Sequence, residues 1–177
     1  MLDFVIYFVG FIVVSIGFVT FFGAPYVPTL KKQVQDVMQI YPLKKSDVFV
    51  DVGSGDGIVL RAAADQGAHA VGYELGPWLW LISRYLCRKY PNITIHFGSF
   101  WRKDLPPDTT VVYTFLNGKF MPKLERKLQA HTDKYGKKIS FITYGFKIED
   151  RESKKQQGPM YLYEFKPNDL RNTNIKI

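Results

Sequence analysis

The chain has 177 residues, of which 46% are hydrophobic and 16% aromatic, enough for one compact domain with a short appendage. This composition excludes a disordered or collagen-like chain. The single cysteine, Cys87, excludes an internal disulfide and a multi-cysteine metal site, and the histidines show no ligand spacing, so no metal is expected. A net charge of +8 suits nucleic acid, an anionic membrane surface or an acidic partner.

An uncharged segment extends over residues 4–30, and its first part, residues 4–22, is almost wholly apolar or glycine. Because about 20 helical residues cross the hydrocarbon core of a bilayer, this length predicts one membrane-spanning helix within residues 1–23. The alternatives are a buried core helix, which would normally keep a polar stripe, and a cleavable signal peptide, which would open with basic residues. The only charge ahead of the run is Asp3, so we expect the segment to be retained as an anchor.

Four lysines follow the apolar segment, at positions 31, 32, 44 and 45. The positive-inside rule therefore predicts that the rest of the chain lies on the cytoplasmic side of the membrane. A prokaryotic plasma membrane is favoured over a mitochondrial membrane because no arginine-rich transit sequence is present. Lysines beside a bilayer attract anionic head groups, which accounts for much of the charge and disfavours nucleic acid as the partner.

Two prolines, Pro25 and Pro28, predict the end of the spanning helix and an extended exit from the bilayer. Apolar residues then recur at helical spacing from Leu30 to Tyr41, which predicts an amphipathic helix that docks the anchor onto the folded domain. Residues 24–45 are thus expected to connect the anchor to a domain formed by residues 46–177.

The first motif of that domain is a predicted strand, residues 48–52, followed by Gly53-Ser54-Gly55-Asp56-Gly57 and a predicted helix over residues 58–66. Glycines allow a close backbone approach to a ligand, and the start of the helix is expected to offer free amides. A dinucleotide fingerprint would need glycine where the chain has Ile58. The spacing, with Asp51 ahead of it, instead resembles motif I of class I S-adenosylmethionine-dependent methyltransferases.

A second predicted strand, residues 70–73, ends at Glu74, twenty-one residues after Gly53. The ends of adjacent parallel strands border one crevice, so this carboxylate is placed to accept hydrogen bonds from both hydroxyls of a ribose. A solvated glutamate in a turn is the alternative. Each hydrogen bond to a charged acceptor contributes about 1.5–3 kcal/mol, so Glu74 is expected to contribute strongly to affinity.

Strands and helices continue to alternate, which predicts an α/β fold with a doubly wound, mostly parallel, Rossmann-like sheet. The last strand, residues 160–165, is expected to be antiparallel. The segment 145–158 is either a mobile lid or a loop. The remaining predicted elements are strands 93–97, 111–116 and 138–144 and helices 78–89 and 119–131.

Four segments together resemble the membrane-anchored protein-lysine methyltransferases whose mitochondrial members modify the adenine nucleotide translocase and the ATP synthase c subunit, with their prokaryotic relatives: residues 24–29, 51–57, 74–79 and 100–105. The chain departs from that pattern at Gly76, Ser99 and residues 116–118. The resemblance implies S-adenosylmethionine as the cofactor and a membrane protein as the substrate. It implies cofactor contacts at Asp51, Gly53, Ser54, Gly55, Gly57, Glu74, Leu75, Ser99 and Phe100.

The hypothesis is methyl transfer to a lysine amine, which must first lose its proton. Desolvation against aromatic walls lowers the pKa of an amine, and aromatic residues near the expected strand ends offer such walls: Tyr26, Trp101, Tyr113, Phe115, Tyr144 and Phe146. No general base stands out. Asn117 and Tyr144 are the candidate acceptor-side residues, and an ordinary turn asparagine fits Asn117 equally well. The alternatives are methylation of a lipid, a quinone-like molecule or RNA, and a methyltransferase-like binding module without catalysis.

Overall fold

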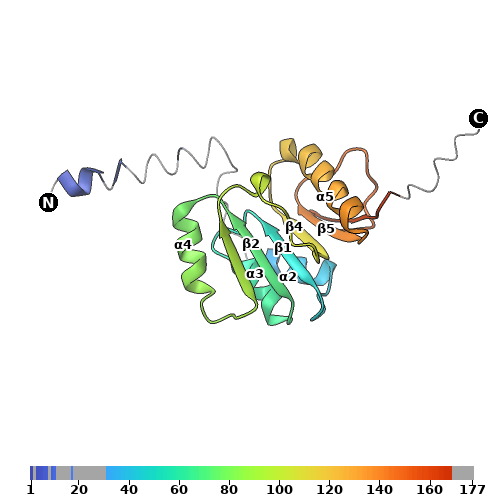
Figure 1. Ribbon diagram of the computed structural model, residues 1–177, viewed down its shortest axis with the longest axis horizontal. Helices are drawn as coiled ribbons and strands as arrows, with labels where there is room; N and C mark the ends of the chain where they lie inside the picture. The colour runs from blue at the N-terminus through green and yellow to red at the C-terminus, as the bar shows by residue number, and fades with distance from the viewer. Residues whose placement is uncertain (2, 8, 11–16, 18–30, 169–177) are drawn as a thin grey trace, which may run out of the picture.

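The computed structural model describes residues 1, 3–7, 9, 10, 17 and 31–168, and its centre is a seven-stranded sheet (Figure 1). The strand order is β3-β2-β1-β4-β5-β7-β6. Strands β1 to β5 are parallel to one another, whereas β7 is antiparallel to both β5 and β6. The strands are β1 Val48–Val52, β2 His69–Glu74, β3 Ile93–Phe97, β4 Val111–Thr114, β5 Ile139–Tyr144, β6 Lys155–Gln157 and β7 Met160–Phe165. The expected Rossmann-like, mostly parallel sheet is confirmed, as is the antiparallel strand at 160–165.

Helices cover both faces of the sheet. Helix α5 packs over one face, and α2 and α3 pack over the other (Figure 1). The helices after the first thirty residues are α2 Lys31–Ile40, α3 Ile58–Asp65, α4 Pro77–Leu86 and α5 Met121–Tyr135, with short 3-10 turns η1 Phe100–Arg102 and η2 Gly118–Phe120. Each face has its own apolar core, so the sheet is held from both sides.

Strand β1 shows how the sheet positions the site, because all five of its residues are buried. Val50 and Val52 lie in the core on the α5 side, and Phe49 lies in the core on the α3 side. Since successive side chains alternate between faces, Asp51 lies on the same face as Phe49. The chain therefore places a carboxylate inside the layer between sheet and α3, at the carboxyl end of the central strand.

Several elements differ from the expectations. Helix α4 ends at Leu86 rather than at 89, and β4 ends at Thr114 rather than at 116. Residues 118–120 form the turn η2, so α5 begins at Met121 rather than at 119 and continues to Tyr135. The segment 145–158, expected as a lid or a loop, contains strand β6 at the sheet edge. The β6 residues are lysine and glutamines, so no alternation of apolar residues marks the strand; it forms by pairing with β7.

The membrane-spanning helix expected within residues 1–23 and the proline exit fall mainly on residues outside the described part of the chain. Within the described residues, none of the helices combines the length and the apolar character that crossing a membrane requires. Helix α2 lies where the amphipathic helix is expected. It buries Val34, Val37 and Ile40 and packs on α3, β6 and β7.

Candidate functional site

The glycine turn between β1 and α3 depends on a backbone conformation that other residues rarely adopt. Gly53, Gly55 and Gly57 have φ angles of 87°, 56° and 78°. A residue with a Cβ atom in this left-handed region costs roughly 1–2 kcal/mol. The turn is also tightly packed, because a Cβ atom on Gly57 would lie 2.9 Å from the Cys87 Sγ atom. Three alternating glycines are therefore needed for the chain to reverse at this point.

The amides of this turn are largely used within the protein. The Gly53 and Ser54 amides both donate to the Tyr73 carbonyl, at 2.9 and 3.1 Å, and the Gly57 amide donates to the Ser54 carbonyl at 2.8 Å. The Ile58 amide donates to Asp56 Oδ1 at 3.1 Å. The expectation of free amides at the start of α3 is thus wrong for Gly57 and Ile58. Because these amides bind groups of the protein itself, they do not form the set of free backbone amides that binds phosphate at other helix starts.

Glu74 ends β2 and joins the glycine turn to the start of α4. Its side chain is only 5% exposed. Its two oxygens accept hydrogen bonds from the Gly55 amide at 2.8 Å and the Gly76 amide at 2.6 Å. Burial raises the pKa of this carboxyl group, and the amides of Gly76, Gly55 and Leu75 oppose that rise. A carboxylate has about four acceptor positions, so each oxygen can still accept from a ligand hydroxyl.

Asp51 supplies a second buried carboxylate, and it is 2% exposed. Burial raises its pKa well above the ordinary value, and the negative charges of Glu74 and Asp56 raise it further. Within residues 31–168 its side chain accepts no hydrogen bond. Repulsion between buried carboxylates is relieved by a cation or by protonation. The donor set therefore suits a ligand that carries both positive charge and neighbouring hydroxyl groups.

Two buried hydroxyls beside these carboxylates have no hydrogen-bond partner in the described part of the chain, those of Ser54 and Tyr113. Tyr113 lies on β4 opposite Asp51 in the strand register. Burial raises the pKa of its phenol, and the charge of Asp51 adds to the effect. Buried polar groups nearly always find a partner, so such orphaned hydroxyls mark a place where a ligand or water is expected. Both flank the carboxyl end of β1.

Ser99 and Phe100 follow β3, in the segment expected to face adenine. The Gly98 amide ties this segment to the site by donating to the Glu74 carbonyl at 2.8 Å. Phe100 itself is buried in the core on the α5 side, with its ring edge-on to those of Tyr73 and Trp101. Phe100 is therefore a core residue, whereas Ser99 is partly exposed.

The acceptor-side candidates lie at the ends of β4 and β5. The Asn117 side chain caps its own turn by accepting from the Lys119 amide at 3.1 Å. Tyr144 packs edge-on against Phe115, with the ring centroids 4.8 Å apart. The expected aromatic walls divide between faces, since Tyr113, Phe115 and Tyr144 belong to the α3 side. Trp101 and Phe146 pack on the α5 side, and Tyr26 lies outside the described residues.

A family model described as the ANTKMT methyltransferase domain matches residues 51–155 of the chain. The chain belongs to this family. The lysine N-methyltransferase of the ATP synthase c subunit from Mus musculus is 37% identical over 108 residues, which are 59% of this chain and 43% of that protein. A protein-lysine N-methyltransferase of Saccharolobus islandicus is 34% identical over 119 residues, 61% of this chain and 72% of that protein.

Among solved structures, an RNA methyltransferase from Salinibacter ruber in complex with S-adenosyl-L-homocysteine has a TM-score of 0.65 and 24% identity. The likeness covers 81% of this chain and 96% of that chain, and at this identity it shows the fold alone. The chain spans less than half the length of the mouse relative. The ANTKMT domain match begins at Asp51 and includes the other residues of the site, Gly53, Ser54, Gly55, Gly57, Glu74, Leu75, Ser99, Phe100, Asn117 and Tyr144.

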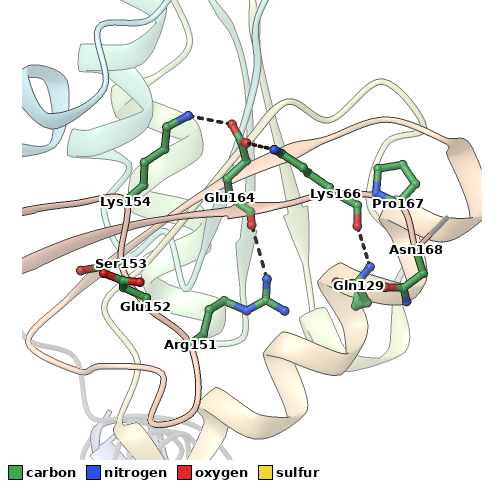
Figure 2. A pocket seen from close by; sticks show the side chains of 9 residues that line it. All are labelled: Gln129, Arg151, Glu152, Ser153, Lys154, Glu164, Lys166, Pro167 and Asn168. Atoms are coloured by element: carbon green, nitrogen blue, oxygen red, sulfur yellow. Dashed lines mark hydrogen bonds and ion pairs between the residues drawn. The ribbon is translucent and has the colours of Figure 1, made fainter.

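A hollow of about 680 Å³ lies elsewhere, between the C-terminal part of the sheet and α5 (Figure 2). Its cations already have partners, because Lys154 and Lys166 both reach the Glu164 carboxylate, at 2.9 and 3.3 Å. Arg151 pairs with Glu125 at 2.9 Å. The described residues contain no cluster that could hold a metal ion. This hollow is therefore an ion-paired surface feature, separate from the glycine-turn site.

Proposed function

We propose that the protein is an S-adenosylmethionine-dependent protein-lysine methyltransferase that acts on a membrane protein. The observation that carries the proposal is the meeting of the three left-handed glycines with the buried carboxylates of Asp51 and Glu74. Membership of the ANTKMT methyltransferase family supports the reaction class. The mouse relative, named for the ATP synthase c subunit, supports a membrane-protein acceptor.

The residues fit this cofactor because it carries a sulfonium, an α-ammonium group and a ribose. Glu74 would accept hydrogen bonds from the ribose hydroxyls, and Asp51 would face the positively charged part. The cofactor supplies an activated methyl group when it is bound. The chain's task is to align the acceptor and to keep water out.

The acceptor side must provide a neutral amine. A lysine with a pKa of about 10.4 needs about 4 kcal/mol to be neutral at pH 7.5, at about 1.36 kcal/mol per pKa unit. Burial of the amine against Phe115 and Tyr144 would supply part of this through desolvation. The amine would give up its proton to solvent before transfer, and the walls formed by Phe115 and Tyr144 would keep it neutral and oriented toward the methyl group that the cofactor supplies.

In the proposed arrangement, residues 1–23 form a single-pass anchor and residues 24–45 connect it to the methyltransferase domain. That domain, residues 46–177, lies on the cytoplasmic side. The length of the uncharged segment and the lysines that follow it support this arrangement. Protease treatment of sealed membranes tests it: the domain should be cleaved from the cytoplasmic side alone, and cleavage from the other side would overturn the orientation.

Incubation of the full chain with methyl-labelled S-adenosylmethionine and host membranes tests the function. Products are separated by gel and by organic extraction, with Glu74→Ala as the inactive variant and Glu149→Ala, at an exposed surface position, as the matched control. A discrete labelled protein band that is lost only in Glu74→Ala supports the proposal. Label in the organic phase would indicate a lipid or quinone-like acceptor. Label in RNA would indicate that RNA is the acceptor. Cofactor binding without any labelled product would indicate a binding module.

A further inference from the structure

Helix α4 has four large apolar side chains on its outside, whereas Trp78, Leu79 and Trp80 are half-buried. Tyr85 is 64% exposed, and Leu81, Ile82 and Leu86 on the same helix are also exposed. The one fully buried residue of the helix is Ser83. Amphipathic surface helices normally direct the apolar stripe inward. In α4 a further apolar stripe faces outward, and hydrophobic burial within the domain does not account for it.

The inner face of α4 explains why small residues are needed there. A Cβ atom on Gly57 would lie 3.3 Å from the Ser83 Cβ atom and 2.9 Å from the Cys87 Sγ atom. The helix therefore packs directly against the glycine turn, and larger residues at these two positions would push it away. Because the outer residues have no part in this contact, they are free to serve another surface.

The exposed stripe continues onto the neighbouring edge strand β3, where Phe97 is 49% exposed. The Phe97 and Trp80 rings lie 5.4 Å apart, which connects the strand to the helix. We call this surface the α4 patch, defined by Leu81, Ile82, Tyr85, Leu86 and Phe97. In Figure 1 it belongs to the end of the sheet that carries α4 and β3, away from β6 and β7.

The sequence segment that carries the α4 patch has charges of one sign. No aspartate or glutamate occurs between Glu74 and Asp104 in the sequence, whereas the same interval contains five arginines and lysines: Arg84, Arg88, Lys89, Arg102 and Lys103. Arg84 lies over the Trp80 ring at 5.2 Å and Arg88 lies over the Tyr85 ring at 4.0 Å. The guanidinium groups are thus held at the border of the apolar stripe.

We propose that the α4 patch docks on an anionic lipid bilayer surface. A stripe of leucine, isoleucine and aromatic residues with arginines at its border is the chemistry of a helix that lies in the membrane interface. The apolar side chains enter the boundary between head groups and acyl chains, and the arginines pair with anionic head groups. The charged side chains that border the stripe on α4 itself, Arg84 and Arg88, are both cationic, which matches anionic head groups.

The consequence for the site follows from the start of α4. The Gly76 amide just ahead of α4 donates to Glu74, so the docked helix begins at the cofactor carboxylate. Docking would hold the carboxyl ends of the strands beside the head groups. Together with the proposed function, on which this step rests, it predicts an acceptor lysine at head-group level rather than deep in the bilayer or far from it.

The docking itself is tested with the full chain in vesicles, independently of methylation. A thiol-reactive fluorophore is attached at position 82 of the Ile82→Cys, Cys87→Ala variant, and a matched variant carries the label at position 134 of α5 (Lys134→Cys, Cys87→Ala). Vesicles contain phosphatidylcholine alone or equal parts of phosphatidylcholine and phosphatidylglycerol, with brominated acyl chains as the quencher. Retained cofactor binding shows that both labelled variants are folded.

We expect brominated lipid to quench the label at position 82 and not the label at position 134, with stronger quenching when phosphatidylglycerol is present. Replacing either Arg84 or Arg88 by glutamine should lower the ratio of docked to undocked protein about fivefold at low salt. Lys134→Gln on α5 is the control and should have no effect. Flotation with phosphatidylcholine alone reports on the anchor separately, because an anchor needs no anionic lipid.

Three results would overturn the docking. Quenching of the label at position 82 by aqueous iodide, with none by brominated lipid, would show a patch that faces water. Shielding from both quenchers at every protein-to-lipid ratio would show that another segment of the chain covers the patch. Shielding that disappears on dilution of the protein in the bilayer would show a second copy. Loss of methylation with normal quenching would count against the proposed function and not against the docking.

Discussion

Two groups of buried or half-buried carboxylates in this molecule have opposite surroundings. At the glycine turn, Glu74 accepts hydrogen bonds from backbone amides and Asp51 lies close enough to feel its charge, and the pKa of both is raised, with burial as the main cause. At the C-terminal end of the sheet, Glu164 meets three lysines, and a hydrogen bond from Lys154 is the main cause of its lowered pKa. Asp51 and Glu74 have no cationic side chain as a cause of their pKa shifts, whereas Glu164 has lysines. The first pair therefore suits a cationic ligand, and Glu164 belongs to a structural ion cluster.

The largest expected effect is on ligand affinity, from Glu74→Ala. Removing the acceptor of two ribose hydroxyls at about 1.5 kcal/mol each should weaken S-adenosylmethionine binding about 100-fold. Isothermal titration calorimetry measures the change. Glu164→Ala is the matched control, because its carboxylate serves lysines on the other side of the domain and its loss should leave affinity unchanged. Equal affinity of Glu74→Ala and the wild type would remove Glu74 from the site.

Gly57→Ala should destabilise the fold by about 2 kcal/mol. The new Cβ atom requires left-handed backbone and lies 2.9 Å from the Cys87 Sγ atom. Gly136→Ala is the matched control: it has a φ of 64° but nothing within 4 Å of the new atom, so it should cost about 1 kcal/mol. Urea unfolding measures both. If the close contact matters, Cys87→Ala should recover part of the loss in Gly57→Ala and none in Gly136→Ala.

Asp51→Asn should raise the stability of the cofactor-free protein by about 1 kcal/mol at neutral pH while lowering cofactor affinity. The pKa of Asp51 is higher in the folded than in the unfolded state, so the folded protein binds more protons between these values. The free energy of unfolding therefore increases as the pH falls through that window. The variant should show a weaker increase than the wild type in urea unfolding at a series of pH values. An unchanged pH dependence would show that the Asp51 side chain is already compensated.

The sequence predicted the parts of this molecule whose signals are local. The apolar run at 48–52, the glycine spacing and the acidic end of the next strand were sufficient to place β1, the turn and Glu74 together. Strand β6 could not be predicted, because Lys155, Gln156 and Gln157 carry no apolar alternation and pair only through β7. The amide network of the turn was also missed, since its acceptor, the Tyr73 carbonyl, comes from a strand about twenty residues away.

The same reasoning explains why the sequence predicts only an ordinary helix at α4. The spacing of its apolar residues shows which residues share one face of the helix, but it does not show which face packs against the sheet. Ser83 and Cys87 decide that, because they alone are small enough for the contact with Gly57. The orientation of α4 thus depends on tertiary contacts, so the α4 patch could be recognised only from the structure, where α4 packs against the glycine turn.

The smallest expected effect is that of Glu164→Gln on stability. Its three lysine partners are 62–73% exposed, so solvent screens the ion pairs and their loss should cost about 0.5 kcal/mol. The lowered pKa of Glu164 means that this contribution is present above the ordinary glutamate value and is lost as the pH falls below it. Urea unfolding at low and high salt measures it, with the difference between Glu164→Gln and wild type shrinking at high salt. A salt-independent loss of several kcal/mol in the free energy of unfolding would mean that Glu164 stabilises β7 by something other than charge. Glu164 would then not differ from Asp51 and Glu74 through its ion pairs.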